Sequence, residues 1–471
     1  MALTSLHDDV AVEAAGRRAG GPAAPVAPPA VDGHWLLGVL PMMRSDPLGF
    51  FAGLANTHGG VVRLNLAGHK ALMLTDPRAI RHVMQDNYRN YRKSKFYGPL
   101  KPMLGGGIFM AEGDRWLTQR RVANPAFQGC RMPALLDAMV AGTRDMLDRW
   151  EQAGSLSIDL APEMTRVTLD IILRSLLGYR MDDEYEALYR ALATLLADAE
   201  KRAWSFFSLP TWVPTKRNRE CAAAHAAIAD LVEKVIASRR MSGERREDLL
   251  DAFIQAYSDP AAGGFQPSIL VDEVRSFILA GHETTANALC WLWLELSRHP
   301  EVLARCTAEI DRELGGGAPT LTTVQKLTYC RAVLDETLRV HPTVWTVSRQ
   351  ANAADRIGDL AIARDQTVIL SPYAVHHRKA LWGDPERFRP ERFLEPTHDP
   401  FAYIPFIKGP RSCLGSRFSL FEALVVMAMT LQRFTVQVVD PDSVKPLPMI
   451  TLRPDGPVMG RVRPREVRAA A

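Results

Sequence analysis

The sequence predicts a mainly α-helical protein with a smaller β-rich part, and three observations support this prediction. Most of residues 131–260 are Ala- and Leu-rich segments with apolar residues at helical spacing, separated at Gly154 and Gly178. A longer helical pattern follows from Ser268 to His299 and ends before a proline. Short apolar runs typical of strands occur near the two ends of the chain. We therefore expect small sheets beside a large helical body.

The length and composition are compatible with one large domain. A chain of 471 residues could hold two or three average domains, but enzymes of this length often form a single unit. Residues 1–32 are rich in Ala, Gly and Pro and contain no long apolar run, so we expect a disordered leader and no signal peptide. We expect residues 33–471 to form a single domain.

Charge and cysteine usage narrow the functional classes. The net charge of +4 is small and the Lys and Arg residues are spread along the chain, so nothing indicates nucleic-acid binding. The six cysteines form no CxxC pairs, which argues against a zinc site and against a disulfide framework. No segment approaches the ~18 consecutive apolar residues of a membrane span. We therefore expect a cytoplasmic protein without a membrane span, and a monomer.

The first part of the chain predicts a β-hairpin followed by an irregular apolar segment. Two apolar runs, VVRLNLA and KALMLT, flank Gly68-His69 and read as paired strands. The segment from Phe96 to Met110 contains prolines and three successive glycines, so it is too broken for a helix and too apolar for an ordinary surface loop. Further short strands are expected over residues 362–372 and 446–462.

Trp116 and Arg120 form a polar pair on an expected helix. Because they are four residues apart, they lie on one helix face and can present an indole N–H and a guanidinium together, which suits an anionic ligand. In isolation such a pair is more often a packed helix whose Arg extends to water. Four aromatic residues, which more often mark a core, cluster farther along at Trp204, Phe206, Phe207 and Trp212.

The expected long helix breaks its apolar pattern at its centre. Asp272 and Glu273 lie near its N-terminus, where acidic side chains are favourable. The central segment AGHETT then places a glycine, two titratable groups and two hydroxyls in a row. Thr284 can donate its hydroxyl to the carbonyl of Ala280, which bends the helix and leaves room beside it. A zinc site of the HExxH type is excluded because Ala286 stands where the second His is needed.

The most specific chemical signal is the segment from Phe406 to Gly415, FIKGPRSCLG. Its Cys413 comes just before an expected helix over Leu414–Gln432, where the helix dipole and free N–H groups lower a thiol pKa and favour the metal-binding thiolate. The two glycines allow the backbone to lie close to a flat partner. The alternative interpretation is that the cysteine is a small buried hydrophobe.

The spacing F-x-x-G-x-R-x-C-x-G resembles the haem-binding signature of the cytochrome P450 superfamily, with Phe406, Gly409, Arg411, Cys413 and Gly415 in register. The resemblance implies the cytochrome P450 fold, haem b (iron protoporphyrin IX) as cofactor, and Cys413 as the metal ligand. A thiolate ligand donates electron density to haem iron and favours O–O cleavage. Because membrane-bound members carry an anchor that this sequence lacks, the chain resembles the soluble, bacterial type.

Three further segments occur in the family's order. W-x-x-x-R-R…PAF resembles the helix that contacts a haem propionate, and A-G-x-E-T-T resembles the oxygen-binding groove, in which Glu283 and Thr284 would pass protons to dioxygen. Glu336, Arg339 and Arg392 resemble a buried triad that would be a rigid support and not a catalyst. The cofactor contacts that the resemblance implies are Cys413, Trp116, Arg120, Arg349, Arg411, Phe406, Gly415 and Ala280.

The function implied by the resemblance is a monooxygenase that inserts one oxygen atom from O2 into a small apolar organic molecule, by hydroxylation or epoxidation. Fatty acids, terpenoids, steroids and polyketides would all suit an apolar pocket. The expected lining residues of that pocket are Phe109, Phe207, Ala280, Val344 and Ile450.

The sequence also indicates where the electrons come from, and it leaves two alternative functions open. No flavin, nicotinamide or iron–sulfur motif is present, so the donor would be a separate ferredoxin or flavodoxin with its reductase. Arg120, Arg121 and Arg417 lie in segments that the family places around the proximal haem face, where they could attract an acidic donor. One alternative is a haem-thiolate peroxygenase or isomerase, whose members commonly lose the acid–Thr pair. The other is a non-enzymatic haem sensor or carrier, which would not require Thr284.

Overall fold

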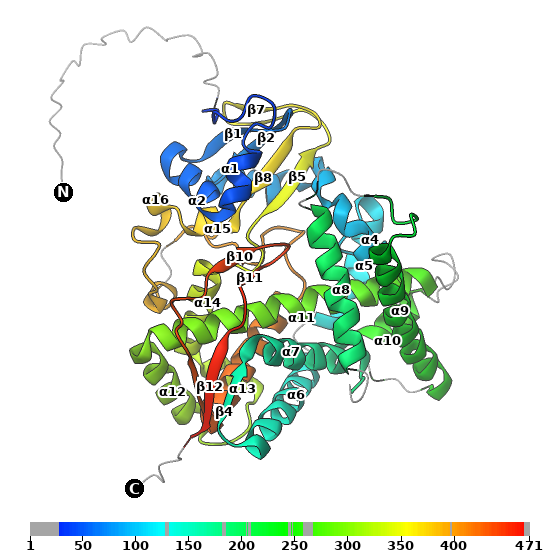
Figure 1. Ribbon diagram of the computed structural model, residues 1–471, viewed down its shortest axis with the longest axis vertical. Helices are drawn as coiled ribbons and strands as arrows, with labels where there is room; N and C mark the ends of the chain where they lie inside the picture. Colours follow the sequence, from blue (N-terminus) through cyan, green and yellow to red (C-terminus); the bar gives the residue numbers. More distant parts are fainter. Residues whose placement is uncertain are drawn as a thin grey trace, which may run out of the picture.

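The computed structural model describes residues 28–127, 131–180, 185–203, 205, 209–243, 246, 248–257, 267–395 and 398–465. It is mainly helical with small sheets, as the sequence predicts (Figure 1). The longer helices are α2 (Pro47–His58), α5 (Gly113–Ala123), α6 (Met132–Ala153), α7 (Leu160–Leu177), α8 (Tyr185–Ala203), α9 (Lys216–Ser242), α10 (Leu249–Tyr257), α11 (Pro267–Arg298), α12 (Pro300–Leu314), α14 (Thr328–Val340) and α17 (Ser416–Arg433). The shorter helices are α1 (Leu40–Ser45), α3 (Pro77–Arg81), α4 (Lys101–Leu104), α13 (Leu321–Lys326), α15 (Pro372–His376) and α16 (Lys379–Trp382).

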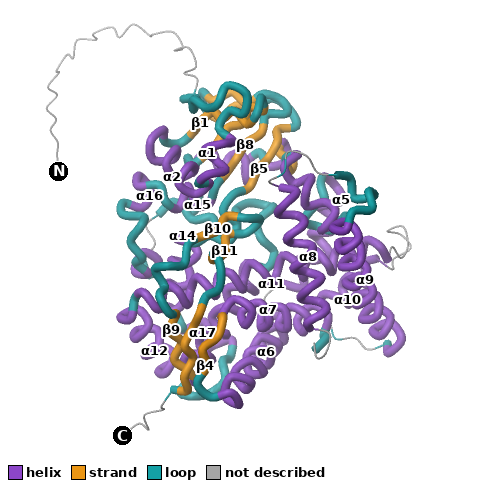
Figure 2. The backbone as a smooth tube through the Cα atoms, viewed as in Figure 1, coloured by secondary structure: helices purple, strands orange, loops and turns teal. Residues whose placement is uncertain are grey.

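Most strands gather at two opposite ends of the view, with the helices between them (Figure 2). One sheet has the order β1-β2-β8-β5-β3, and a second has the order β4-β12-β9. In the first sheet β2 and β8 are parallel, while its other neighbouring strands are antiparallel. The strands are β1 (Val61–Leu66), β2 (His69–Leu74), β3 (Tyr91–Lys93), β4 (Leu156–Asp159), β5 (Val347–Ala351), β6 (Asp355–Ile357), β7 (Leu360–Ile362), β8 (Thr367–Leu370), β9 (Phe434–Val438), β10 (Pro446–Pro448), β11 (Leu452–Pro454) and β12 (Met459–Pro464).

The predicted hairpin is confirmed as β1 and β2, and its turn residues Ala67 and Gly68 both have positive φ angles. Strand β4 was not predicted, because it lies inside a region that reads as helical and is formed only by pairing with β12. Residues 28–32, which the sequence assigns to the leader, belong to the described part of the chain. Although residues 1–27 lie outside the described residues, the N–H of Val31 donates to the carbonyl of Arg63 at 3.2 Å, which attaches this segment to β1.

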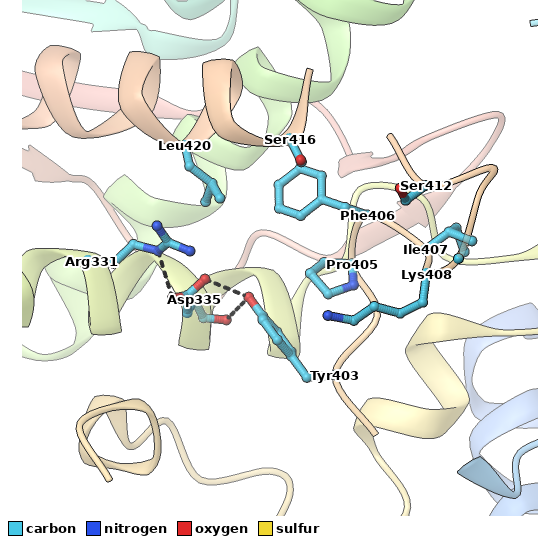
Figure 3. A pocket seen from close by; sticks show the side chains of 11 residues that line it. Arg331, Asp335, Tyr403, Pro405, Phe406, Ile407, Lys408, Ser412, Ser416 and Leu420 are labelled. Carbon is cyan, nitrogen blue, oxygen red and sulfur yellow. Dashed lines mark hydrogen bonds and ion pairs between the residues drawn. The ribbon is translucent and has the colours of Figure 1, made fainter. Parts of the chain in front are cut away.

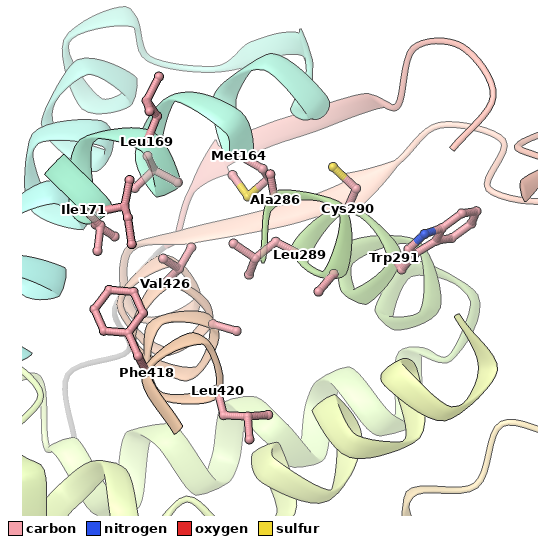
Figure 4. Close-up of a cluster of buried hydrophobic side chains, with 14 of the residues drawn as sticks. Met164, Leu169, Ile171, Ala286, Leu289, Cys290, Trp291, Phe418, Leu420 and Val426 are labelled. Carbon is pink, nitrogen blue, oxygen red and sulfur yellow. The ribbon is translucent and has the colours of Figure 1, made fainter. Parts of the chain in front are cut away.

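Helix α11 is the central element of the helical body. Its 32 residues span about 48 Å at 1.5 Å per residue, and its ends lie within one residue of the predicted limits. It packs against α7 and α17, and Figure 4 shows apolar side chains of the three helices interleaving. Because full burial of each such side chain contributes ~1.5–3 kcal/mol, this contact holds α11 rigidly in place. Members of this cluster include Met164, Leu169, Ile171, Ala286, Leu289, Phe418 and Val426.

The segment from Phe96 to Met110 is more helical than the sequence predicts. It contains part of a 3₁₀ turn over Lys95–Leu100 and the whole of α4. The carboxylate of Asp272 accepts from the N–H of Gly106 at 2.6 Å, and that of Glu273 accepts from the N–H of Ile108 at 2.9 Å. These two acids, expected only to favour the start of α11, therefore also fasten this segment to the helix.

Two expected absences can be compared with the described residues. None of the described helices is long and apolar enough to cross a membrane. All cysteines in the described part of the chain are free thiols.

Of the aromatic cluster expected from the sequence, Trp204, Phe206 and Phe207 lie outside the described residues. Trp212 is 81% exposed, so it is not part of a core.

Candidate functional site

Cys413 lies in a turn that is shaped by backbone hydrogen bonds and by one glycine. The N–H of Cys413 donates to the carbonyl of Phe406 at 3.0 Å, and the N–H of Ser412 donates to the carbonyl of Gly409, also at 3.0 Å. Gly409 has φ +78°, and a Cβ at this position would lie 2.0 Å from the carbonyl oxygen of Met84. Only glycine fits both requirements. These contacts hold Cys413 in a fixed position just before α17, in the segment from Phe406 to Gly415, which we call the cysteine loop.

The thiol of Cys413 is exposed, so it is not the buried hydrophobe of the alternative interpretation. Its pKa is nevertheless raised, because desolvation by the surrounding protein atoms outweighs the lowering effects of the Gly415 N–H and the Arg120 guanidinium. This corrects the expectation that the position before a helix lowers the thiol pKa. A metal ion on the sulfur would reverse the balance, since a coordinating thiol is deprotonated.

Trp116 and Arg120 both belong to α5, but their side chains have different partners. The Nη1 of Arg120 donates to the carbonyl of Ser412 at 2.6 Å, next to Cys413, so Arg120 supports the cysteine loop directly. Trp116 is buried, and the guanidinium of Arg411 lies over its ring at 4.4 Å. In the structure the two side chains of α5 therefore have different protein partners.

A cluster of cations surrounds Glu112 near this point. The Nζ of Lys93 lies 3.3 Å from Oε1 of Glu112, and Arg411 donates to the other carboxylate oxygen. Lys93 is opposite Arg349 in the pairing of β3 with β5. The pKa of Lys93 is lowered to about 8, mainly by burial; the charges of Arg411 and Arg349 contribute to the lowering, and Glu112 opposes it.

This cluster suits a second anion besides Glu112. Lys93 and Arg411 both pair with the one carboxylate, and the charge of Arg349 acts on both of these cations. The Nε and Nη1 of Arg411 have no hydrogen-bond partner among the described residues. Buried donors of a charged group are costly when unpaired, so an added carboxylate would stabilise them. The haem propionates, which are carboxylates, fit this position. Lys93 was missed from the sequence because only the pairing of distant strands brings it here.

The centre of α11 has the local geometry that the sequence predicts. The hydroxyl of Thr284 donates to the carbonyl of Ala280 at 2.8 Å. Ala280 is exposed although residues 273–279 directly before it on α11 are buried, which indicates open space beside this turn. His282 is buried and hydrogen-bonded to the carbonyl of Ile278 at 2.7 Å, and burial lowers its pKa to about 4. The histidine is therefore neutral and structural.

The side chains of Glu283 and Thr284 have different hydrogen-bond partners. Its Oε1 accepts a hydrogen bond of 2.7 Å from the hydroxyl of Thr451, just before β11. The pKa of Glu283 is raised to about 7, mainly by desolvation; the charge of Glu200 contributes to the rise, and the Thr451 hydroxyl and Arg453 oppose it. A carboxyl with this pKa can both take up and release a proton near neutral pH.

Glu336, Arg339 and Arg392 meet in one buried group. The Oε2 of Glu336 lies 2.7 Å from Nε of Arg339, and its Oε1 lies 2.9 Å from Nη2 of Arg339 and 3.4 Å from Nε of Arg392. The same Oε1 accepts from the N–H of Arg389 at 2.8 Å. The side chains of Glu336 and Arg339 are completely buried. The group thus joins α14 to the segment that precedes the cysteine loop.

The described members of the five expected pocket residues have different surroundings. Phe207 lies outside the described residues, and Phe109 is 38% exposed with its ring 6.1 Å from that of Tyr97. Val344 and Ile450 pack against two different hydrophobic clusters. Of the five, Ala280 is the one for which the structure shows open space within the site.

A separate cavity of about 320 Å³ lies between the cysteine loop, α14 and α17 (Figure 3). In its wall, Asp335 accepts from Nε of Arg331 at 2.7 Å and from the hydroxyl of Tyr403 at 2.9 Å. Phe406 and Lys408 also line it, whereas Cys413 does not. It is therefore not the space beside Ala280.

Comparisons with known proteins agree with this geometry. The family model "Cytochrome P450" matches residues 28–459. The chain is 30% identical to cyclooctat-9-en-7-ol 5-monooxygenase of Streptomyces melanosporofaciens over 85% of this chain and 88% of that protein. It is also 30% identical to cyclooctatin synthase of the same organism, over 89% and 91%.

Among solved structures, the haem domain of cytochrome P450DA aligns with a TM-score of 0.84 and 30% identity, covering 94% of this chain and 99% of that one. Both the sequence match and the fold therefore extend over nearly the whole chain, far beyond the cysteine loop on which the resemblance was first based. We conclude that the chain belongs to the cytochrome P450 family, the haem-thiolate monooxygenases.

Proposed function

We propose that this monooxygenase inserts one oxygen atom from O2 into an apolar cyclic molecule, using electrons from a separate redox protein. The observation that carries the proposal is the combination of an exposed cysteine in a rigid loop with open space beside Ala280 and Thr284. A thiolate ligand favours O–O cleavage on haem iron, and an accessible hydroxyl beside it can take part in proton delivery. A haem carrier would require only the first.

The residues present fit haem b. We propose that Cys413 binds the iron and that Arg349 and Arg411 hold the propionates, with Lys93 as a further cation. Arg120 supports the loop through its hydrogen bond to Ser412. When bound, the haem supplies the oxygen-activating chemistry, while the protein positions it and controls access of water and protons.

We propose that Thr284 and Glu283 control the protons. The Thr284 hydroxyl donates to Ala280 at rest, and its lone pairs remain available to accept a hydrogen bond in the open space. Glu283, with a pKa raised to about 7, is partly protonated at neutral pH and can act as donor. The neighbouring His282 is excluded from this role because it is buried and committed to the carbonyl of Ile278.

The substrate class is proposed from the names of two relatives. One is named for the 5-monooxygenation of cyclooctat-9-en-7-ol and the other for the synthesis of cyclooctatin. We propose a cyclic substrate with a mainly hydrocarbon skeleton, which places the terpenoids first among the apolar classes. At 30% identity these names do not extend to the particular compound.

We propose that a ferredoxin or flavodoxin donates the electrons. Arg121 and Arg417 are exposed and close in sequence to Arg120 and Cys413, so they present positive charge near the cysteine loop. Arg120 is excluded from this role because its guanidinium is used within the loop. Charge pairs of this kind steer an acidic partner to the surface.

The experiment loads the protein with haem and follows its absorption spectrum while cyclic terpenoid alcohols, fatty acids, steroids and polyketides are added. We expect a spectral shift with the first class, and incorporation of one labelled atom from ¹⁸O2 when ferredoxin and its reductase are supplied. Cys413→Ser should abolish the strongly red-shifted Soret band of the reduced carbon monoxide complex. Product formed equally well from hydrogen peroxide without O2 would instead establish a peroxygenase.

A further inference from the structure

Glu283 belongs to a polar network that crosses three elements in the middle of the molecule, α8, α11 and β11 (Figures 1 and 2). From α11, Glu283 accepts from the Thr451 hydroxyl at 2.7 Å. Two residues along the chain from Thr451, the guanidinium of Arg453 lies 3.3 Å from Oε1 of Glu200 on α8. The Nδ2 of Asn287, one turn along α11, donates to the Thr451 hydroxyl at 3.2 Å.

We propose that Glu200 and Glu283 form an acid pair held across α8 and α11 by Thr451 and Arg453, and that this pair holds the proton which Glu283 releases towards Thr284. The proposal rests on the proposed role of Glu283 in proton delivery. It adds a positioning residue, Glu200, which sets the protonation of Glu283 without itself touching the substrate or the cofactor.

The charges around Glu283 are not balanced. Glu200 is only 4% exposed, and the charged groups that act on Glu283 are Glu200 from α8 and Arg453 from β11. Two carboxylates thus share a single cation. A second negative charge in a poorly solvated place is unfavourable, so the pair is partly protonated at neutral pH. Burial also raises the pKa of Glu200, against the lowering effect of Arg453.

The two hydrogen bonds of the Thr451 hydroxyl fix the orientation of Glu283. The Thr451 hydroxyl has one proton, which it gives to Glu283, while it accepts from Asn287. Thr451 therefore orients the carboxylate and leaves its Oε2 free of this bond. Arg453 similarly fixes Glu200, and its own side chain is 37% exposed, so the pair reaches solvent at this end. At the other end, Glu283 adjoins Thr284 and the open space beside Ala280.

These two ends define a direction of transfer. At rest the two carboxyl groups hold a single proton, mainly on Glu283. When Glu283 releases it towards Thr284, both groups are ionised and only Arg453 offsets them. Uptake of one proton from solvent then restores the resting pair. No electron is transferred in these steps.

The test measures the protonation of Glu283 in resting, haem-loaded protein. Infrared spectroscopy follows the carbonyl band of protonated carboxyl groups from about pH 5 to about pH 9, and loss of one band in Glu283→Gln assigns it. We expect this band to disappear with a midpoint near the pKa of about 7. In Glu200→Gln the midpoint should fall by on the order of one pH unit, because a neighbouring negative charge is removed.

Two further variants make the measurement decisive. Arg453→Gln should raise the midpoint, since the shared cation is lost. Glu186→Gln makes the same chemical change as Glu200→Gln on the same helix, but at an exposed position, and should leave the midpoint unchanged. If Glu200→Gln and Arg453→Gln both behave like Glu186→Gln, the acid pair does not exist. If Glu200→Gln does not fold, the direction of the Arg453→Gln shift decides alone.

Turnover separates this inference from the proposed function. The pH profile of product formed per electron pair should move to lower pH in Glu200→Gln together with the infrared midpoint. A shifted midpoint with an unshifted profile would show that the pair exists but does not supply protons, which overturns the inference. Absence of product in the unaltered protein, with the infrared shifts present, would overturn the proposed function alone.

Discussion

Replacing Glu336 with alanine is expected to destabilise the folded protein by about 3–5 kcal/mol, the cost of leaving a buried charge without its partner. The side chains of Glu336 and Arg339 are completely buried, and their two hydrogen bonds measure 2.7 and 2.9 Å. The variant would leave the guanidinium of Arg339 with the carbonyl of His376 as its nearest acceptor, at 2.9 Å. It would also remove the acceptor of the Arg389 N–H.

This loss is large compared with the ~5–15 kcal/mol by which proteins are stable. We expect Glu336→Ala to unfold at a markedly lower guanidinium chloride concentration, followed by circular dichroism, and to retain little haem. Glu391→Ala is the matched control, because Glu391 forms an exposed ion pair with Arg305 at 2.8 Å. Exposed pairs contribute at most ~1 kcal/mol. If the two variants unfolded at the same concentration and bound haem equally, the triad would not be the support that we describe.

Three further predictions concern protons and electrons. Thr284→Ala should keep haem but release most electrons as peroxide, whereas Thr307→Ala, which removes the same type of helix hydrogen bond on α12, should leave the peroxide yield unchanged. The pKa of Glu283 is raised from 4.5 to about 7, so the folded state holds a proton that the unfolded chain has released in this window. Stability should therefore fall as pH rises through the window, by on the order of 1–3 kcal/mol, and Glu283→Gln should remove this dependence in denaturation curves. Reduction by ferredoxin should slow with increasing salt, and Arg121→Glu with Arg417→Glu should slow it at low salt; equal rates under all these conditions would contradict steering by charge.

Much of the local structure could be predicted because it depends on neighbours in the chain. The hairpin over β1 and β2 follows from two alternating runs around a glycine turn, and α11 follows from its long apolar period. The bond from Thr284 to Ala280 needs only the four-residue spacing of a helix. The structure differs from the sequence prediction where residues far apart in the chain pair with each other. An example is β4, which is a strand only because β12 lies beside it.

The candidate site divides in the same way. The sequence by itself determined the cysteine loop, since Gly409 and Cys413 act within one short turn, and it placed Glu336 and Arg339 on one helix face. It also determined the family, because the spacing of these motifs is specific.

Only the tertiary structure decided which groups share a charge environment. Lys93 lies opposite Arg349 through strands that are far apart in the chain, and the charge of Glu200 on α8 acts on Glu283 on α11. The direction of the Cys413 pKa was likewise set by surrounding atoms and not by the nearby helix end. Desolvation and Coulomb interactions depend on distance in space, so spacing along the chain does not contain them.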